Sequence, residues 1–138
     1  MLRKLELEDY YKNFLNLLSQ LTTITDISFY KFEQQFINLG SNYKNFVIER
    51  DNKIIAYGSL FIDYKFYRNY QNIGHIEDII VDEDYRGNGY STQIINKLIE
   101  ESKKYNCYKI VLNCKDNYTN FYNKFGFKKD SCFMIKHL

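Results

Sequence analysis

The stretch from Gly74 to Ser91 constrains the fold of this 138-residue chain more than any other part of it. Residues His75 to Val81 end in three consecutive β-branched residues, which is typical of a β-strand. After an acidic turn at 82–84, the sequence Arg86-Gly87-Asn88-Gly89-Tyr90-Ser91 leads into an amphipathic helix. Glycines let a backbone turn sharply and approach a ligand, and the free N–H groups of a first helical turn attract anions. This order of elements therefore predicts a site for a phosphate-bearing ligand.

Two common phosphate-binding loops fit this segment poorly. A dinucleotide fingerprint needs a third glycine or alanine, whereas Gly87-x-Gly89 continues here as Tyr90-Ser91-Thr92. The Walker loop needs Gly-Lys-Ser or Gly-Lys-Thr, and the chain contains neither triplet. An ordinary strand-to-helix turn remains the alternative for these six residues taken alone.

Composition limits the class of protein. The length suits one domain with a sizeable core, and a net charge of +2 gives no indication of a nucleic-acid partner. Cys107, Cys114 and Cys132 are an odd number of cysteines without metal-ligand spacing, which favours reduced thiols and no bound metal. With no signal peptide or long apolar run, we expect a soluble, cytoplasmic protein without a membrane partner.

Hydrophobic periodicity predicts the remaining elements in the order strand, two helices, three strands, helix, strand, helix, strand. A hairpin turn is expected at Asp51-Asn52, between two strands of the sheet. The order predicts a mixed α/β fold, with a long antiparallel stretch and one parallel crossover around the glycine loop. The strands are expected at 2–7, 46–49, 54–61 (with a possible extension to 67), 75–81, 107–114 and 127–136. The first helix is expected at 9–21, and the second begins after a cap at Asp26. The last two helices are expected at 92–105 and at 117–125.

Arg86-x-x-Gly89-x-Ser91 resembles the pyrophosphate loop of the GNAT superfamily of acetyl-CoA-dependent N-acetyltransferases, usually Gln/Arg-x-x-Gly-x-Gly/Ala. Ser91 departs from the last position of that motif. Three further motifs occur in an order similar to one subfamily, the glucosamine-6-phosphate N-acetyltransferases. They are Gly74-His75-Ile76-Glu77-Asp78-Ile79, Cys107-Tyr108-Lys109-Ile110 and Phe121-Tyr122-x-Lys124-x-Gly126-Phe127.

The resemblance covers nearly the whole chain and is strongest from residue 54 onward. It implies a single GNAT domain over residues 1–138, with a mixed, mostly antiparallel central sheet flanked by helices. It also implies a homodimer that uses acetyl-CoA and no metal. The implied reaction is direct attack of the amine of D-glucosamine 6-phosphate in a ternary complex, which serves UDP-GlcNAc biosynthesis.

The resemblance also implies which residues bind acetyl-CoA. Backbone groups of Ile79, Ile80 and Val81 are expected to pair with the pantetheine arm like an added strand. The remaining implied contacts are Arg86, Gly87, Asn88, Gly89, Tyr90, Ser91 and Thr92 at the pyrophosphate, with Tyr122 and Lys124 from the later motif.

Glu77 and Asp78 are the candidate carboxylates of the catalytic site. Adjacent residues on a regular strand point to opposite faces, so only a β-bulge can direct both at one ligand. The resemblance implies such a bulge, because GNAT strands commonly splay with one at this place. In the subfamily this pair contacts the amino sugar, and the glutamate is often proposed as the base. The alternative is a solvated pair at a strand edge.

Tyr122 is the candidate acid, because a phenol can donate a hydrogen bond or a proton to a departing thiolate. The resemblance implies this role, since the family places such a tyrosine in the corresponding helix. The alternative is a core aromatic residue packed among Phe121, Phe125 and Phe127.

The sugar phosphate requires cations, and the resemblance implies Lys65, Arg68 and Lys109 for this purpose. Each of them alone could equally be an ordinary surface charge. The resemblance also implies substrate contacts at Thr22, Tyr108, Asn113 and His137. Asn113 stands where the family usually has an acidic residue, Tyr118 where it often has asparagine, and His137 where it tends to place an arginine that reaches across the dimer.

Three other functions remain open at this stage. One is acetylation of a different amine, such as another amino sugar, a polyamine or a peptide N-terminus. Another is a non-catalytic acyl-CoA-binding module, which the presence of Glu77, Asp78 and Tyr122 argues against. The third is a nucleic-acid binder, which the absence of a basic stripe makes the weakest alternative.

Overall fold

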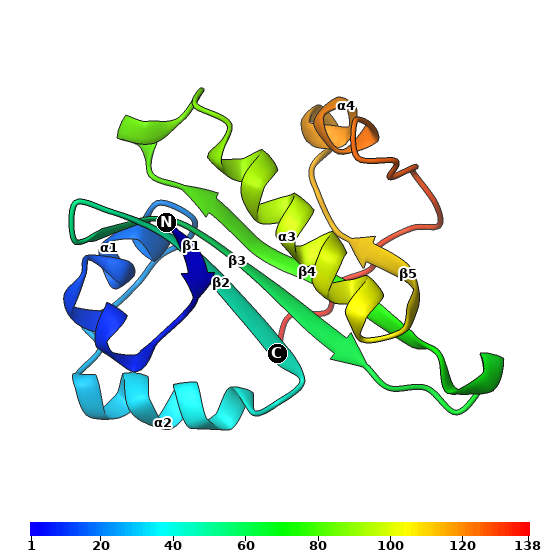
Figure 1. Cartoon of the computed structure of the whole chain (residues 1–138), viewed down its shortest axis with the longest axis horizontal. Helices are drawn as coiled ribbons and strands as arrows, with labels where there is room; N and C mark the ends of the chain where they lie inside the picture. The colour runs from blue at the N-terminus through cyan, green and yellow to red at the C-terminus, as the bar shows by residue number, and fades with distance from the viewer.

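Five strands form one sheet in the order β1-β2-β3-β4-β5, and the computed structural model describes residues 1–138 (Figure 1). Neighbouring strands from β1 to β4 are antiparallel, whereas β4 and β5 are parallel. This arrangement confirms the predicted mixed, mostly antiparallel sheet. The strands are β1 (Leu2–Lys4), β2 (Tyr43–Arg50), β3 (Lys53–Asp63), β4 (Asn72–Val81) and β5 (Cys107–Leu112).

Helix α3 (Tyr90–Lys104) connects the two parallel strands and covers one face of the sheet (Figure 1). Its Ile94 and Leu98 are fully buried in a cluster that includes Leu60 and Ile76 of the strands. These apolar residues recur at the three- and four-residue spacing of a helix face, so their burial fixes the helix on the sheet. None of the helices is both long enough and apolar enough to cross a membrane.

The opposite face carries a second core cluster near α1 (Phe14–Ser19). Phe14 and Leu17 pack there against Val47, Tyr57 and Ile80. Helix α2 (Phe29–Leu39) contains no buried residue and joins this cluster through partly buried aromatic side chains. The two clusters place the sheet between helices on both faces, as the sequence predicts.

Strands β4 and β5 pair only over the first half of β4. Asn72 to Ile76 are partners of Cys107 to Leu112, whereas Glu77, Ile80 and Val81 have partners in β3 alone. One edge of the second half of β4 is therefore free of strand pairing. A free strand edge presents backbone donors and acceptors to a ligand.

The first predicted elements differ from the structure. The strand ends at Lys4, and a 3-10 turn η1 (Leu7–Tyr11) and the short α1 replace the single helix expected at 9–21. The reason is the buried Asp9 carboxylate, which accepts from both terminal nitrogens of Arg3 and from the Glu6 N–H. Asn13 then adopts a left-handed conformation with φ of 68°, which separates η1 from α1.

Two later boundaries also differ. The cap of α2 is Ser28, whose hydroxyl accepts from the Lys31 N–H, rather than Asp26. The short helix before Gly126 consists of a 3-10 turn η4 (Asp116–Tyr118) and α4 (Thr119–Asn123).

The strand expected at 127–136 is wrong for the single chain. Residues beyond α4 form no strand, and the side chains of 128–138 are exposed. A strand requires a partner edge, and this segment pairs with none within its own chain. Its apolar residues therefore face solvent, with Phe133 64%, Met134 86% and Ile135 64% exposed.

Candidate functional site

A β-bulge interrupts β4 at the two candidate carboxylates. Glu77 pairs with Ser59 and Ile80 pairs with Tyr57, so Asp78 and the residue after it together oppose Gly58. Asp78 has a positive φ of 55°, which is rare outside glycine, asparagine and aspartate. The expected bulge is therefore confirmed, and it breaks the alternation that would otherwise direct the two carboxylates to opposite faces.

The electrostatics of the bulge favour proton transfer. Partial burial raises the pKa of Glu77, the neighbouring Asp78 charge raises it further, and His75 acts in the opposite direction. Partial burial likewise raises the pKa of Asp78. A carboxylate with a raised pKa holds a proton more strongly and is therefore a better general base near neutral pH.

The glycine loop connects β4 to α3 through the 3-10 turn η3 (Glu83–Tyr85). Gly87 and Gly89 both have φ of 80°, a conformation that other residues adopt only with strain. The first backbone bond of α3 runs from Gln93 N to Gly89 O, so the N–H groups before it have no partner in the helix. A hollow of about 70 Å³ lies at this helix start, lined by Val81, Tyr85, Arg86, Gly87, Gly89, Tyr90 and Ser91.

Side chains of the loop hold its shape. The Asn88 amide donates to the carbonyls of Tyr85 and Arg86, and the Arg86 guanidinium donates to the Val81 carbonyl at 3.1 Å. The Tyr90 ring packs against the core, and its hydroxyl accepts from Arg50. The loop therefore offers main-chain N–H groups to an anion, while several of its side chains serve the fold.

Tyr122 lies on α4, beyond the end of β5. The ring is half-buried and makes edge contacts with Phe121 and Phe127. Burial raises the pKa of the Tyr122 phenol, and the neighbouring Cys114 and Tyr118 add to the effect. The phenol consequently remains protonated at neutral pH and can act as a donor.

The predicted cations gather near one aromatic ring. The Arg68 guanidinium carbon is 4.5 Å from the centre of the Tyr108 ring, and the Lys109 ammonium is 5.6 Å from it. Lys65 forms an ion pair with Asp63 at 2.8 Å, and this bond raises the pKa of the lysine. Arg68 and Lys109 have no carboxylate partner, so their charges are available to an anionic ligand.

Other predicted residues remain apart from this arrangement. No hydrogen bond or ion pair joins the side chains of Thr22, Thr92, Asn113, Lys124 and His137 to the other predicted residues. Thr22 lies three residues after the end of α1, and the side chain of the C-cap Gln20 accepts from the Glu83 N–H. Asn113 follows the last paired residue of β5, and His137 is exposed near the C-terminus.

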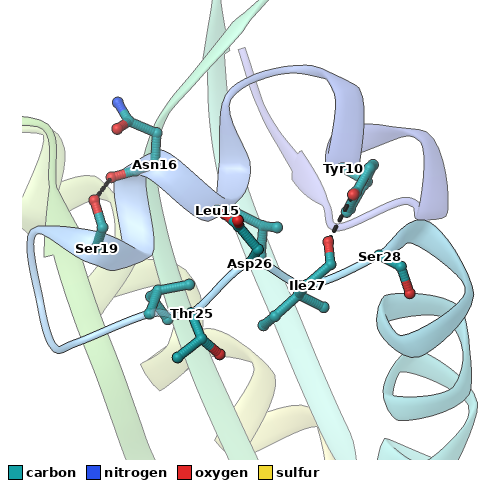
Figure 2. Close-up of a pocket in the computed structure, with 9 residues that line it drawn as sticks. Tyr10, Leu15, Asn16, Ser19, Thr25, Asp26, Ile27 and Ser28 are labelled. Atoms are coloured by element: carbon teal, nitrogen blue, oxygen red, sulfur yellow. Dashed lines mark hydrogen bonds between the residues drawn. The ribbon is translucent and has the colours of Figure 1, made fainter.

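A larger hollow lies elsewhere in the molecule. Figure 2 shows this space of about 590 Å³, which η1, α1 and the segment before α2 line. The Tyr10 hydroxyl donates to the Ile27 carbonyl beside it. Asp26 supplies the only carboxylate of the lining, and none of the residues predicted for chemistry belongs to it. We therefore assign the candidate site to the bulge and the glycine loop.

Sequence reasoning missed a polar group beneath the bulge. The hydroxyls of Tyr57 and Ser59 both donate to the side-chain oxygen of Asn45. The available signal was weak: polar residues two positions apart on a strand that is otherwise apolar. Their contact with Asn45 depends on the register of β2 against β3, which the predicted hairpin alone does not specify.

Residues 2–127 match the model of the acetyltransferase (GNAT) family. The chain belongs to this family. GNAT acetyltransferases use acetyl-CoA, and the free N–H groups of the glycine loop suit the diphosphate of that molecule. The unpaired edge of β4 likewise suits an extended pantetheine chain.

Relatives within the GNAT family extend over nearly the full chain. The glucosamine 6-phosphate N-acetyltransferase of Arabidopsis thaliana is 36% identical, with 99% of this chain and 95% of the relative covered. Glucosamine 6-phosphate N-acetyltransferase 1 of Dictyostelium discoideum is 37% identical, with 99% of this chain and 89% of the relative covered. The crystal structure of the Arabidopsis enzyme superposes with a TM-score of 0.94, covering 99% of this chain and 97% of that one.

Proposed function

We propose that this GNAT acetyltransferase transfers the acetyl group of acetyl-CoA to the amine of D-glucosamine 6-phosphate. The observation that carries the proposal is the bulge in β4, which sets Glu77 and Asp78 beside an unpaired strand edge and the glycine loop. Relatives that bear the name glucosamine 6-phosphate N-acetyltransferase support this choice of acceptor.

The loop and the strand edge divide the recognition of acetyl-CoA between them. Main-chain N–H groups of the loop and of the first turn of α3 bind the pyrophosphate. Backbone groups of residues 79–81 hydrogen-bond the pantetheine amides in the manner of a strand. Positioning both substrates side by side supplies much of the rate.

The chemistry then needs a base and an acid. Glu77 accepts a proton from the ammonium of the sugar, and the neutral amine attacks the thioester carbonyl. When the carbon–sulfur bond breaks, the Tyr122 hydroxyl gives its proton to the departing thiolate, and the second proton released by the nitrogen returns the phenol to its neutral form. The raised pKa of Glu77 suits a base, and the raised pKa of Tyr122 keeps its phenol protonated at neutral pH.

Arg68 and Lys109 bind the phosphate of the sugar in this proposal. Both are cations without a carboxylate partner, and both lie against the Tyr108 ring. Lys65 contributes charge nearby while its ammonium stays bonded to Asp63. A phosphate has enough acceptor oxygens to bond several such donors at once.

We expect glycine at position 89 to be essential for binding acetyl-CoA. Gly89→Asp places a side chain at a backbone φ of 80° and a negative charge at the pyrophosphate site. CoA affinity, measured by calorimetry on the folded variant, should fall at least about tenfold. Gly40→Asp at the end of α2 also has a positive φ, of 64°, lies outside the loop and serves as the matched control. Unchanged affinity in Gly89→Asp would contradict the assignment of the loop.

We also propose a homodimer, which the exposed C-terminal segment and the unpaired edge of β5 support. Phe133 and Ile135 are each 64% exposed, and burying them on a partner subunit removes apolar surface from water. Light scattering should give about twice the chain mass of 16.7 kDa. Replacing both residues by aspartate should yield monomers, whereas Tyr30→Asp on α2 should not. A monomeric wild-type protein at micromolar concentration would refute the dimer.

The function itself is tested by release of free thiol from acetyl-CoA. Glucosamine 6-phosphate should support rapid release, and glucosamine without phosphate should be a much poorer acceptor. Rapid release with a polyamine or peptide amine, and none with the sugar phosphate, would replace this proposal by acetylation of a different amine. Binding of acetyl-CoA without turnover of any amine would favour a non-catalytic module.

A further inference from the structure

A row of three polar residues crosses the sheet beneath the bulge. Asn45 of β2 pairs with Ser59 of β3, and Ser59 pairs with Glu77 of β4. Directly opposed residues of antiparallel strands present their side chains to the same face, with Cβ atoms roughly 4.5–5.5 Å apart. The Ser59 hydroxyl therefore lies between the Asn45 amide and the Glu77 carboxylate.

The hydroxyls of Ser59 and of the neighbouring Tyr57 donate to Asn45 and not to Glu77. Ser59 Oγ donates to Asn45 Oδ1 at 2.7 Å, and the Tyr57 hydroxyl donates to the same oxygen at 2.9 Å. Both donors are buried, with 1% of Ser59 and 7% of Tyr57 exposed. A hydroxyl carries one proton, so Ser59 cannot donate to Asn45 and Glu77 at the same time.

We propose that Asn45 is a positioning residue for the base: by accepting the Ser59 hydroxyl proton, it keeps the Glu77 carboxylate free of a hydrogen-bond donor. This inference rests on the proposed role of Glu77 in proton transfer. The Asn45 amide acts indirectly, since it accepts hydrogen bonds from Ser59 and Tyr57 and makes none to Glu77. Nothing in the motifs of the sequence identifies Asn45.

The charges around Glu77 set the expected direction of the effect. Glu77 faces Asp78 and His75, and beyond His75 lie Asp63 and Lys65. A hydroxyl that donates to a carboxylate stabilises its charged form and lowers its pKa. If Asn45 is removed, Ser59 becomes free to donate to Glu77. The pKa of Glu77 should then fall, and Glu77 becomes a weaker base.

The test uses three variants of the full chain: Asn45→Ala, Ser59→Ala and the two combined. The pKa of Glu77 is followed by carbon-13 NMR titration of its side-chain carboxyl, with Glu77→Gln to assign the signal. We expect Asn45→Ala to lower this pKa by about one unit. Ser59→Ala should leave it near the wild-type value, because no donor is gained. The double variant should return to the wild-type value, because the freed donor is absent.

Turnover gives a second readout of the same effect. Because Glu77 acts in its ionised form, the rate rises with pH through its pKa, and Asn45→Ala should shift this acidic limb to lower pH. An unchanged Glu77 titration in Asn45→Ala, or a double variant that keeps the shift, would overturn the inference. Calorimetry with CoA shows that each variant is folded. If glucosamine 6-phosphate is not a substrate, the proposed function fails, while the NMR titration still decides the role of Asn45.

Discussion

Replacing Tyr122 with phenylalanine is expected to lower kcat about 100- to 1,000-fold, the usual cost of losing one preorganised donor at a developing negative charge. The substitution removes only the hydroxyl, so the edge contacts of the ring with Phe121 and Phe127 remain. The variant should therefore fold normally and keep its KM values for both substrates. The measurement is the steady-state rate at saturating acetyl-CoA and sugar phosphate.

The matched control for this experiment is Tyr30→Phe. Tyr30 lies on α2 with 68% of its surface exposed, and its hydroxyl forms no hydrogen bond. Its loss should leave the rate at the wild-type level. A wild-type rate for Tyr122→Phe would mean that the ring at 122 only packs, and another group would have to protect the departing thiolate.

Replacing Lys109 with alanine should raise the KM for glucosamine 6-phosphate about ten- to a hundredfold, since a hydrogen bond to a charged group is worth roughly 1.5–3 kcal/mol. The KM for acetyl-CoA should hardly change, because Lys109 does not line the hollow at the glycine loop, where we propose that acetyl-CoA binds. Lys109 has no carboxylate partner to leave unpaired, so its loss should not damage the fold. Steady-state kinetics with each substrate varied in turn measure the effect.

Glucosamine without phosphate separates phosphate recognition from a general loss of activity. With this sugar, Lys109→Ala and the wild type should have equal KM values. Lys103→Ala removes an exposed lysine from the last turn of α3 and should change neither constant. If Lys109→Ala raises the KM for both sugars equally, the phosphate site lies elsewhere, and acetylation of a different amine becomes the leading function.

The central elements of the fold could be predicted because their signals are local. The turn at Asp51-Asn52 has positive φ values of 50° and 59°, as its asparagine and aspartate suggest for a tight hairpin. The glycine loop between a strand and a helix likewise indicated the parallel crossover. The prediction of one helix at 9–21 was wrong because the bidentate bond from Arg3 to Asp9 outweighs the helical spacing of the apolar residues there. Periodicity contains no information about such a contact.

The candidate site could be predicted only in part, for a related reason. Side-chain alternation alone puts Glu77 and Asp78 on opposite faces, so the bulge was expected from the family resemblance and not from the pattern. The group around Asn45 was missed because strand register brings its members together. The predicted C-terminal strand was wrong because the apolar residues of 127–136 indicate that the segment tends to be buried, but they do not indicate which surface buries it.

Gly58 has a further consequence for the relation between the two substrates. A Cβ atom there would lie 2.3 Å from Ile94 Cγ2 of α3 and 2.8 Å from Ile79 Cδ1 of the bulge. Helix α3 and the bulge of β4 thus both pack against a residue that has no side chain. In the proposed complex α3 begins at the diphosphate of acetyl-CoA and β4 carries the base, so we expect a larger residue at position 58 to push these elements apart and to misplace the amine relative to the thioester.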